Sequence, residues 1–148
     1  MAYKSLTPKI VTSGSGATVT LTAAQTDSVI LMDRAAGIIF TLPAATAALK
    51  GTSYKFVVKT SVTSNNYSVV GASNADLFYG GVALTNTTAG NAISAGPNGS
   101  SNYQCTMNGT TTGGLKGTVI TATCLGLNAW LIDGIVSGSG TLATPFAG

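Results

Sequence analysis

Histidine and glutamate are absent from this chain of 148 residues, and its seven Lys and Arg residues and four Asp residues make up only 7% of it. A soluble protein of average composition carries about 25% charged residues. Without histidine, most acid–base relays, Ser-His-Asp triads and zinc sites lose their usual residues. The composition therefore predicts a protein that is not an enzyme and holds no cofactor and no metal.

The four carboxylates are Asp27, Asp33, Asp76 and Asp133. A glycosidase would need two of them facing each other across a cleft. Each one lies beside a predicted turn, where an Asp side chain commonly bonds to nearby backbone. A calcium site of Asp and Asn oxygens stays open as an alternative, although the sequence has no Asp-x-Asp-x-Asp-Gly spacing. We expect turn formation, and not catalysis, from all four.

The net charge of +3 comes from cations that are scattered along the chain. Nucleic-acid-binding proteins usually gather Lys and Arg on one face, and the nearest approach here is Lys50, Lys55 and Lys59. These lysines are typical of an exposed strand face. The sequence therefore predicts no nucleic-acid partner.

The most hydrophobic stretch, residues 28–49, is interrupted by Asp33, Arg34 and Pro43. A membrane helix needs about 20 nearly uninterrupted apolar residues, so this stretch is interpreted as two core strands and no membrane contact is expected. The first residues show no apolar core of a secretory signal. Cys105 and Cys124 are therefore expected to be reduced and buried, although their spacing leaves a disulfide open.

Short runs of β-branched and aromatic residues alternate with Gly, Asn, Ser and Pro, which is typical of all-β domains. The predicted strands are 17–22, 28–33, 37–43, 52–60, 67–71, 76–84, 92–94, 102–109, 115–127 and 128–136. We expect one all-β domain over residues 1–148, a β-sandwich, jelly roll or barrel of about nine or ten antiparallel strands.

Four local features refine this picture. Segments 28–33 and 37–43 are predicted to form a buried hairpin, and 102–109, 115–127 and 128–136 to form three successive antiparallel strands.

Within 52–60, the alternation places Tyr54, Phe56 and Val58 on the core side. The glycine pair at 80–81 predicts a bulge or a close backbone approach.

The shortage of charge also bears on assembly. A free monomer needs a solvated surface dotted with charges, whereas this surface must consist mostly of Thr, Ser, Asn, Gly and Ala. Sheet edges are also poorly guarded, because Lys and Pro are few. We therefore expect much of the surface to be covered by protein, through contacts that depend little on salt.

Two parts of the sequence resemble a known family. One part consists of Thr41-Leu42-Pro43, an Ala-rich connector to Gly51 and the run YKFVV at 54–58. It is similar to a pattern of tailed-bacteriophage virion proteins that joins two strands of a small β-domain. LTAAQTDSVILMD at 21–33 and NAWLIDGIV at 128–136 are similar to the flanks of that pattern. The resemblance extends over about residues 19–72 and 118–140. It implies a capsid decoration (cement) protein, and the same pattern occurs in head-fibre and tail-fibre modules.

What the resemblance implies is a homotrimeric β-domain on the capsid exterior, over junctions between major capsid proteins. Such a protein would be made in the host cytoplasm and become part of the virion. On this hypothesis residues 1–12 are an extended N-terminal arm on the capsid lattice. The candidate capsid contacts are Tyr3, Lys4, Leu6, Lys9 and Ile10.

Residues 137–148 are expected to be a docking tail, because their apolar end has too little polarity to prefer water. The candidate subunit-interface residues are Trp130, Leu142 and Phe146. The competing interpretation is that Trp130 lies in the core and that both termini pack on their own domain.

The alternative function is a tail-fibre or head-fibre module that recognises a host glycan. The Thr- and Asn-rich loop at 85–101 would supply hydrogen bonds, and Tyr79 or Trp130 would stack on a sugar ring.

Overall fold

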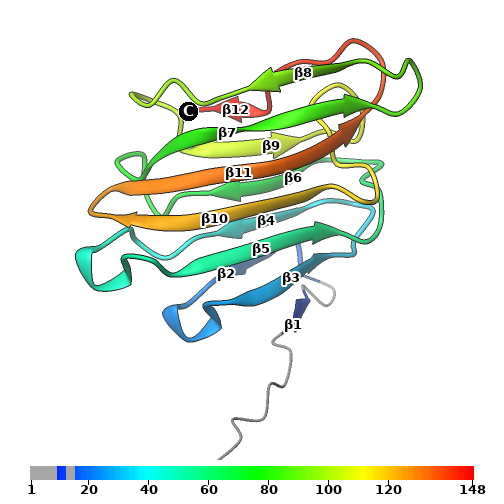
Figure 1. The fold of residues 1–148 in the computed structure, drawn as a ribbon. Coiled ribbons are helices and arrows are strands. Elements are labelled where there is room, and N and C mark those ends of the chain that lie inside the picture. Colours follow the sequence, from blue (N-terminus) through cyan, green and yellow to red (C-terminus); the bar gives the residue numbers. More distant parts are fainter. Residues whose placement is uncertain (1–9, 13–15) are drawn as a thin grey trace, which may run out of the picture.

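A computed structural model describes residues 10–12 and 16–148 of the chain. Two β-sheets lie face to face and enclose one hydrophobic core, so that the molecule is a β-sandwich (Figure 1). Both sheets end in open edges and do not close into a barrel. The expectation of an all-β sandwich is confirmed.

The larger sheet has seven strands, which are β1 (Ile10–Thr12), β3 (Ser28–Met32), β5 (Ser53–Val58), β7 (Leu77–Asn86), β8 (Ala92–Ala95), β10 (Val119–Gly126) and β11 (Ala129–Gly138). The smaller sheet has five, which are β2 (Thr18–Thr20), β4 (Ile38–Thr41), β6 (Tyr67–Val70), β9 (Gln104–Met107) and β12 (Phe146–Ala147). The spatial orders are β1-β3-β5-β10-β11-β7-β8 and β12-β9-β6-β4-β2. Two short 3-10 helices, η1 (Ala23–Gln25) and η2 (Ala47–Leu49), lie in the connections. Each of the ten predicted strand segments overlaps an observed strand, and β1 and β12 are additional.

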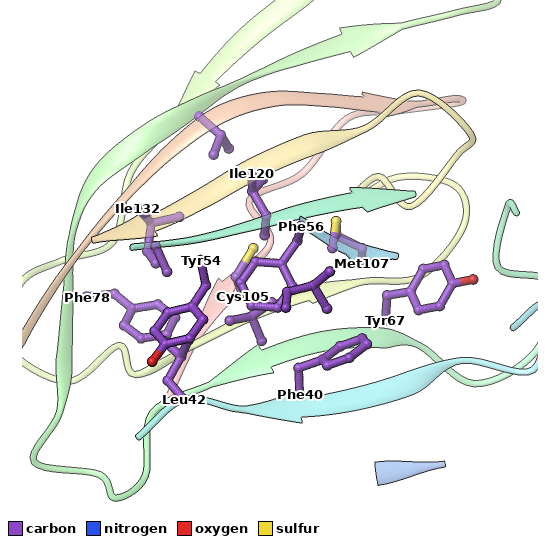
Figure 2. Packing of buried hydrophobic residues seen from close by; sticks show 14 of the residues in the cluster. Phe40, Leu42, Tyr54, Phe56, Tyr67, Phe78, Cys105, Met107, Ile120 and Ile132 are labelled. Atoms are coloured by element: carbon purple, nitrogen blue, oxygen red, sulfur yellow. The ribbon is translucent and has the colours of Figure 1, made fainter. Parts of the chain in front are cut away.

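Alternate residues of the strands fill the space between the sheets (Figure 2). Tyr54, Phe56 and Val58 of β5 are buried, as their alternation predicted. The rings of Phe40 and Phe56 meet edge to face across the two sheets, with centroids 5.6 Å apart. Because a fully buried side chain of this kind contributes about 1.5–3 kcal/mol, this interior stabilises the sandwich strongly.

The strand pairing is mixed, and the expectation of antiparallel strands throughout is wrong. Of the ten pairings described, five are parallel. The reason is that the chain alternates between the sheets from β1 to β7. Each crossing reverses the chain direction, so strands two apart in sequence return to the same sheet and run parallel. This produces β1-β3-β5 in one layer and β2-β4-β6 in the other.

Two predicted local pairings are wrong for the same reason. Segments 28–33 and 37–43 do not form a hairpin, because the turn at 34–37 carries the chain from β3 in one sheet to β4 in the other. Segment 102–109 provides β9 of the smaller sheet, so it does not pair with β10. The hairpin of β10 and β11 is antiparallel as predicted.

The glycine pair at 80–81 lies in β7 where two other strands come close. A Cβ atom on Gly80 would lie 2.5 Å from the carbonyl oxygen of Ile132, and one on Gly81 would lie 2.8 Å from that of Ala95. The predicted close backbone approach is confirmed. It lets β7 form a ten-residue parallel ladder with β11.

Candidate assembly surfaces

Trp130 lies in the core of its own subunit and is fully buried. Its ring packs beside Tyr54, with centroids 5.9 Å apart. The assignment of Trp130 to a subunit interface is therefore wrong, because no part of the side chain reaches the surface. The strand pattern places it inward, since residues 130 and 132 of β11 alternate with the outward-facing residues 131 and 133.

The C-terminal tail docks on its own domain. Phe146 is buried in β12, which pairs with β9 at Cys105. Leu142 is half-buried and packs against the same core. The assignment of Phe146 to a subunit interface is thus wrong, and the tail end of segment 137–148 forms the edge strand β12 of the smaller sheet.

Only the end of the predicted N-terminal arm falls within the described residues. Ile10 begins β1, which pairs in parallel with β3 so that Ile10 lies opposite Val29. This part of the segment 1–12 is an edge strand and not an arm. The other candidate capsid contacts, Tyr3, Lys4, Leu6 and Lys9, lie outside the described residues.

Among the described residues, the strands of the smaller sheet present no ionisable side chain on its outer face. We call it the neutral face, and its residues are Thr18, Thr20, Ile39, Thr41, Ser68, Val70, Gln104, Thr106 and Ala147. The register aligns them in two rows across the strands. Near the centre, the hydroxyls of Ser68 and Thr106 are hydrogen-bonded at 3.2 Å, and the apolar side chain of Ile39 is 43% exposed.

The outer face of the larger sheet has a different character. Its apolar row, one residue from each of five adjacent strands, consists of Leu31, Val57, Val119, Ile135 and Ala83. Ile135, in the middle of β11, is 58% exposed and so adds apolar surface to this row. The row beside it contains Lys55, Thr121 and Asp133, which lie opposite one another on β5, β10 and β11.

Two aspartates have the turn role that was predicted. Asp27 lies in a turn with a positive φ of 59° and accepts a hydrogen bond from the Ser53 hydroxyl at 3.2 Å. Asp76 is buried, and its carboxylate accepts hydrogen bonds from the backbone N–H groups of Ala45 and Ser73.

Asp133 departs from the prediction, because it lies exposed in the middle of β11. Asp33 directly follows β3.

We next searched the described residues for a metal site, a cavity and a membrane span. The described residues contain no group of three His, Cys, Asp or Glu residues that could hold a metal ion. An open depression of about 460 Å³ overlaps one end of the neutral face, where Ile39 and Ser68 line it, and its one charged lining residue is Arg34. The Arg34 guanidinium donates a hydrogen bond of 2.7 Å to the Gly37 carbonyl. No helix among the described residues has the length and hydropathy of a membrane span.

Both cysteines are free and buried, so the prediction of reduced thiols is confirmed. Burial raises the pKa of the Cys105 thiol from 9.0 to about 12. Since the thiolate is the reactive form, Cys105 is chemically inert in the folded protein.

Of the two aromatic residues predicted for the glycan site, only Tyr79 is exposed. Tyr79 is 38% exposed on β7, whereas Trp130 cannot stack on a sugar because it is buried. A Cβ atom on Gly99 would lie 3.3 Å from the Tyr79 ring, so the turn at 98–102 borders this ring. That turn is held by the Asn98 side chain, whose oxygen accepts hydrogen bonds from three backbone N–H groups. The loop 85–101 contains the predicted short strand as β8.

Comparison with family models, with curated proteins and with solved structures finds no match to this chain.

Proposed function

We propose that this chain is a structural virion protein, a capsid decoration protein that binds the outside of a phage head and stabilises contacts between major capsid proteins. The observation that carries this proposal is the neutral face. A surface that meets water normally carries charged side chains of both signs. A whole sheet face without one suits a surface that other protein covers.

The chemistry of the neutral face supports such a contact. Its Thr, Ser and Gln side chains form hydrogen bonds, and burying them avoids the large desolvation cost of a charge. Ile39 supplies an apolar anchor near the centre of the face. Because no ion pair on this face would contribute, binding should change little with ionic strength.

The role of the sandwich is mechanical. Behind the neutral face, the inward side chains of Phe40 and Tyr67 are fully buried in the core. Protein interiors of this density have low compressibility and transmit strain. A plate of this kind, bound across two neighbouring capsid proteins, would resist their separation under internal DNA pressure.

The resemblance further implies three copies in each assembly, with a mass near 44 kDa from three chains of 14.7 kDa. It also implies that the N-terminal residues, among them Tyr3, Lys4, Leu6 and Lys9, contact the capsid. Both stay predictions.

The experiment is to rebind the purified protein to phage heads that have been stripped of their decoration protein, and to measure the bound fraction by sedimentation. We expect saturable binding whose affinity changes less than about threefold between low and high salt. Ile39→Lys should weaken binding at least about tenfold, since it places an unpaired charge in the contact. Leu127→Lys is the matched control, because Leu127 is 73% exposed at the tip of the β10–β11 hairpin, outside the neutral face.

Failure of the wild-type protein to bind any stripped head would refute the decoration role. Binding that Ile39→Lys and Leu127→Lys weaken equally would show that the neutral face is not the contact. The glycan alternative has its own readout, a glycan array. Binding to one defined sugar that Tyr79→Ala abolishes would favour the receptor-binding function instead.

A further inference from the structure

The apolar row on the outer face of the larger sheet is symmetric about β10, and the proposed decoration function does not involve this face. Val119 occupies the centre of the apolar row on β10. On one side lie Val57 and Leu31, and on the other side lie Ile135 and Ala83, one residue per strand. The row is thus apolar over equal distances on both sides of β10.

We propose that this face binds a second copy of the chain about a twofold axis that runs along β10. Such a rotation keeps β10 on its own axis and exchanges β5 with β11 and β3 with β7. Val119 then meets Val119 of the second copy, and Val57 meets Ile135. The long side chain of Leu31 meets the small side chain of Ala83, so the two rows complement each other in size as well as in polarity.

Among twofold axes parallel to the strands, the charges on the face favour the one along β10. Lys55 and Asp133 lie in the same cross-strand row on either side of Thr121. Rotation about β10 places Lys55 of each copy opposite Asp133 of the other, which forms two symmetric ion pairs. Rotation about β11 would place Asp133 opposite Asp133, and rotation about β5 would place Lys55 opposite Lys55. Like charges in such positions cost several kcal/mol and exclude those arrangements.

The size of the face is sufficient for a stable pair. Seven strands at a spacing of about 4.8 Å make it roughly 30 Å wide, and the eight residues of β10 at about 3.3 Å each make it roughly 26 Å long. The product is about 780 Å², and a standard protein interface uses about 800 Å² on each partner. Two sheets packed face to face in this way would also shield the exposed Ile135 from water.

The pairing does not rest on the decoration role, because it uses the sheet opposite to the neutral face and leaves that face free. It also makes a distinct statement about copy number. A twofold contact gives an even number of chains. The twofold contact is compatible with the threefold assembly implied by the resemblance only in a hexamer, in which two trimers pair.

The test is the mass of the full chain in solution, by sedimentation equilibrium, together with charge reversal. We expect the wild-type protein to have two or six times the chain mass of 14.7 kDa. Lys55→Asp and Asp133→Lys should each halve this number of copies, because each variant places like charges opposite each other and weakens the pair at least about tenfold. An equimolar mixture of the two variants should recover the wild-type mass, and so should the double variant that exchanges the charges.

A folding control and a face control accompany these measurements. Circular dichroism verifies that every variant is folded, and recovery in the mixture itself shows that both single variants keep their structure. Ile135→Lys should also prevent pairing, whereas Ile39→Lys on the neutral face should leave the mass unchanged. A wild-type mass of one or three chains would overturn the proposal. So would single charge variants that keep the wild-type mass, or a mixture that does not recover it.

The two proposals fail separately. Loss of binding to stripped heads with an even copy number would refute only the decoration role, and binding by a protein of one or three copies would refute only the twofold pair.

Discussion

Replacement of Trp130 tests whether this residue stabilises the fold of the subunit or joins subunits together. Its side chain is fully buried and packs beside Tyr54. A buried tryptophan removes about 200 Å² from water, which corresponds to roughly 5 kcal/mol at 25 cal/mol per Å². We expect Trp130→Ala to lower the free energy of unfolding by about 3–5 kcal/mol, the range found for such truncations.

Trp130→Phe should behave differently, and the reason lies in the indole nitrogen. Among the described residues, the Trp130 N–H has no hydrogen-bond partner. A buried donor without a partner costs about 1–3 kcal/mol, and phenylalanine removes that donor while keeping an aromatic ring in the site. The gain offsets part of the lost contact area. We therefore expect Trp130→Phe to cost less than about 1.5 kcal/mol.

Urea unfolding followed by far-ultraviolet circular dichroism measures both values, because the only tryptophan is lost in the variants. The measurement is made at two protein concentrations, so that loss of association is recognised by its dependence on concentration. A Trp130→Ala protein with the wild-type unfolding midpoint but a lower copy number would refute the assignment to the core. Equal losses in Trp130→Ala and Trp130→Phe would refute the argument from the unpaired donor.

Three further predictions concern the fold. Gly134→Ala should destabilise the protein by about 1–3 kcal/mol more than Gly51→Ala. Both glycines have a positive φ, but only at Gly134 would a Cβ atom meet backbone, namely the carbonyl of Val119. Equal thermal midpoints of the two variants would contradict this. Asp76→Ala should cost about 2–3 kcal/mol in urea unfolding, since two backbone N–H groups, one buried and one part-buried, lose their acceptor, and a loss below about 0.5 kcal/mol would contradict it. Burial raises the pKa of Cys105 from 9.0 to about 12, so the stabilisation from keeping this thiol neutral is complete below pH 9 and is lost as the pH rises toward 12. The melting temperature of wild-type protein should fall more steeply over that range than that of Cys105→Ala, and parallel curves would refute the assignment.

The strands could be predicted because their signals are local. Alternation of polar and apolar residues identified the inward face of β5, and paired glycines identified the close approach in β7. Which sheet a strand joins is not a local property. The continuous apolar run of residues 28–33 favours a core strand in a buried hairpin, whereas its outward residues Val29 and Leu31 are half-buried on the outer face of the sandwich. The pattern of residues 28–43 does not distinguish a hairpin within one sheet from a turn that crosses between two sheets, so the predicted hairpin is wrong.

The candidate site was harder to predict than the fold. Trp130 and Phe146 were proposed as contacts because large apolar residues suit interfaces, but the same property suits a core, and tertiary packing decides between the two. The neutral face depends on the cross-strand register of β2, β4, β6 and β9, which come from distant parts of the chain. The general shortage of charge in the sequence is consistent with such a face, but composition does not indicate which strands form it.

The insertion of β10 and β11 between β5 and β7 has a consequence for how the protein is made. When the ribosome has delivered only the residues up to β9, the larger sheet exists as two separate parts with bare edges at β5 and β7. The hairpin that joins them, β10 and β11, follows β9 in the sequence, so the larger sheet closes only after residues 119–138 have been made. Until then those edges are open to wrong partners. Rapid synthesis of β10 and β11, or a chaperone that covers β5 and β7, would protect these edges. Fragments that end before residue 119 should aggregate.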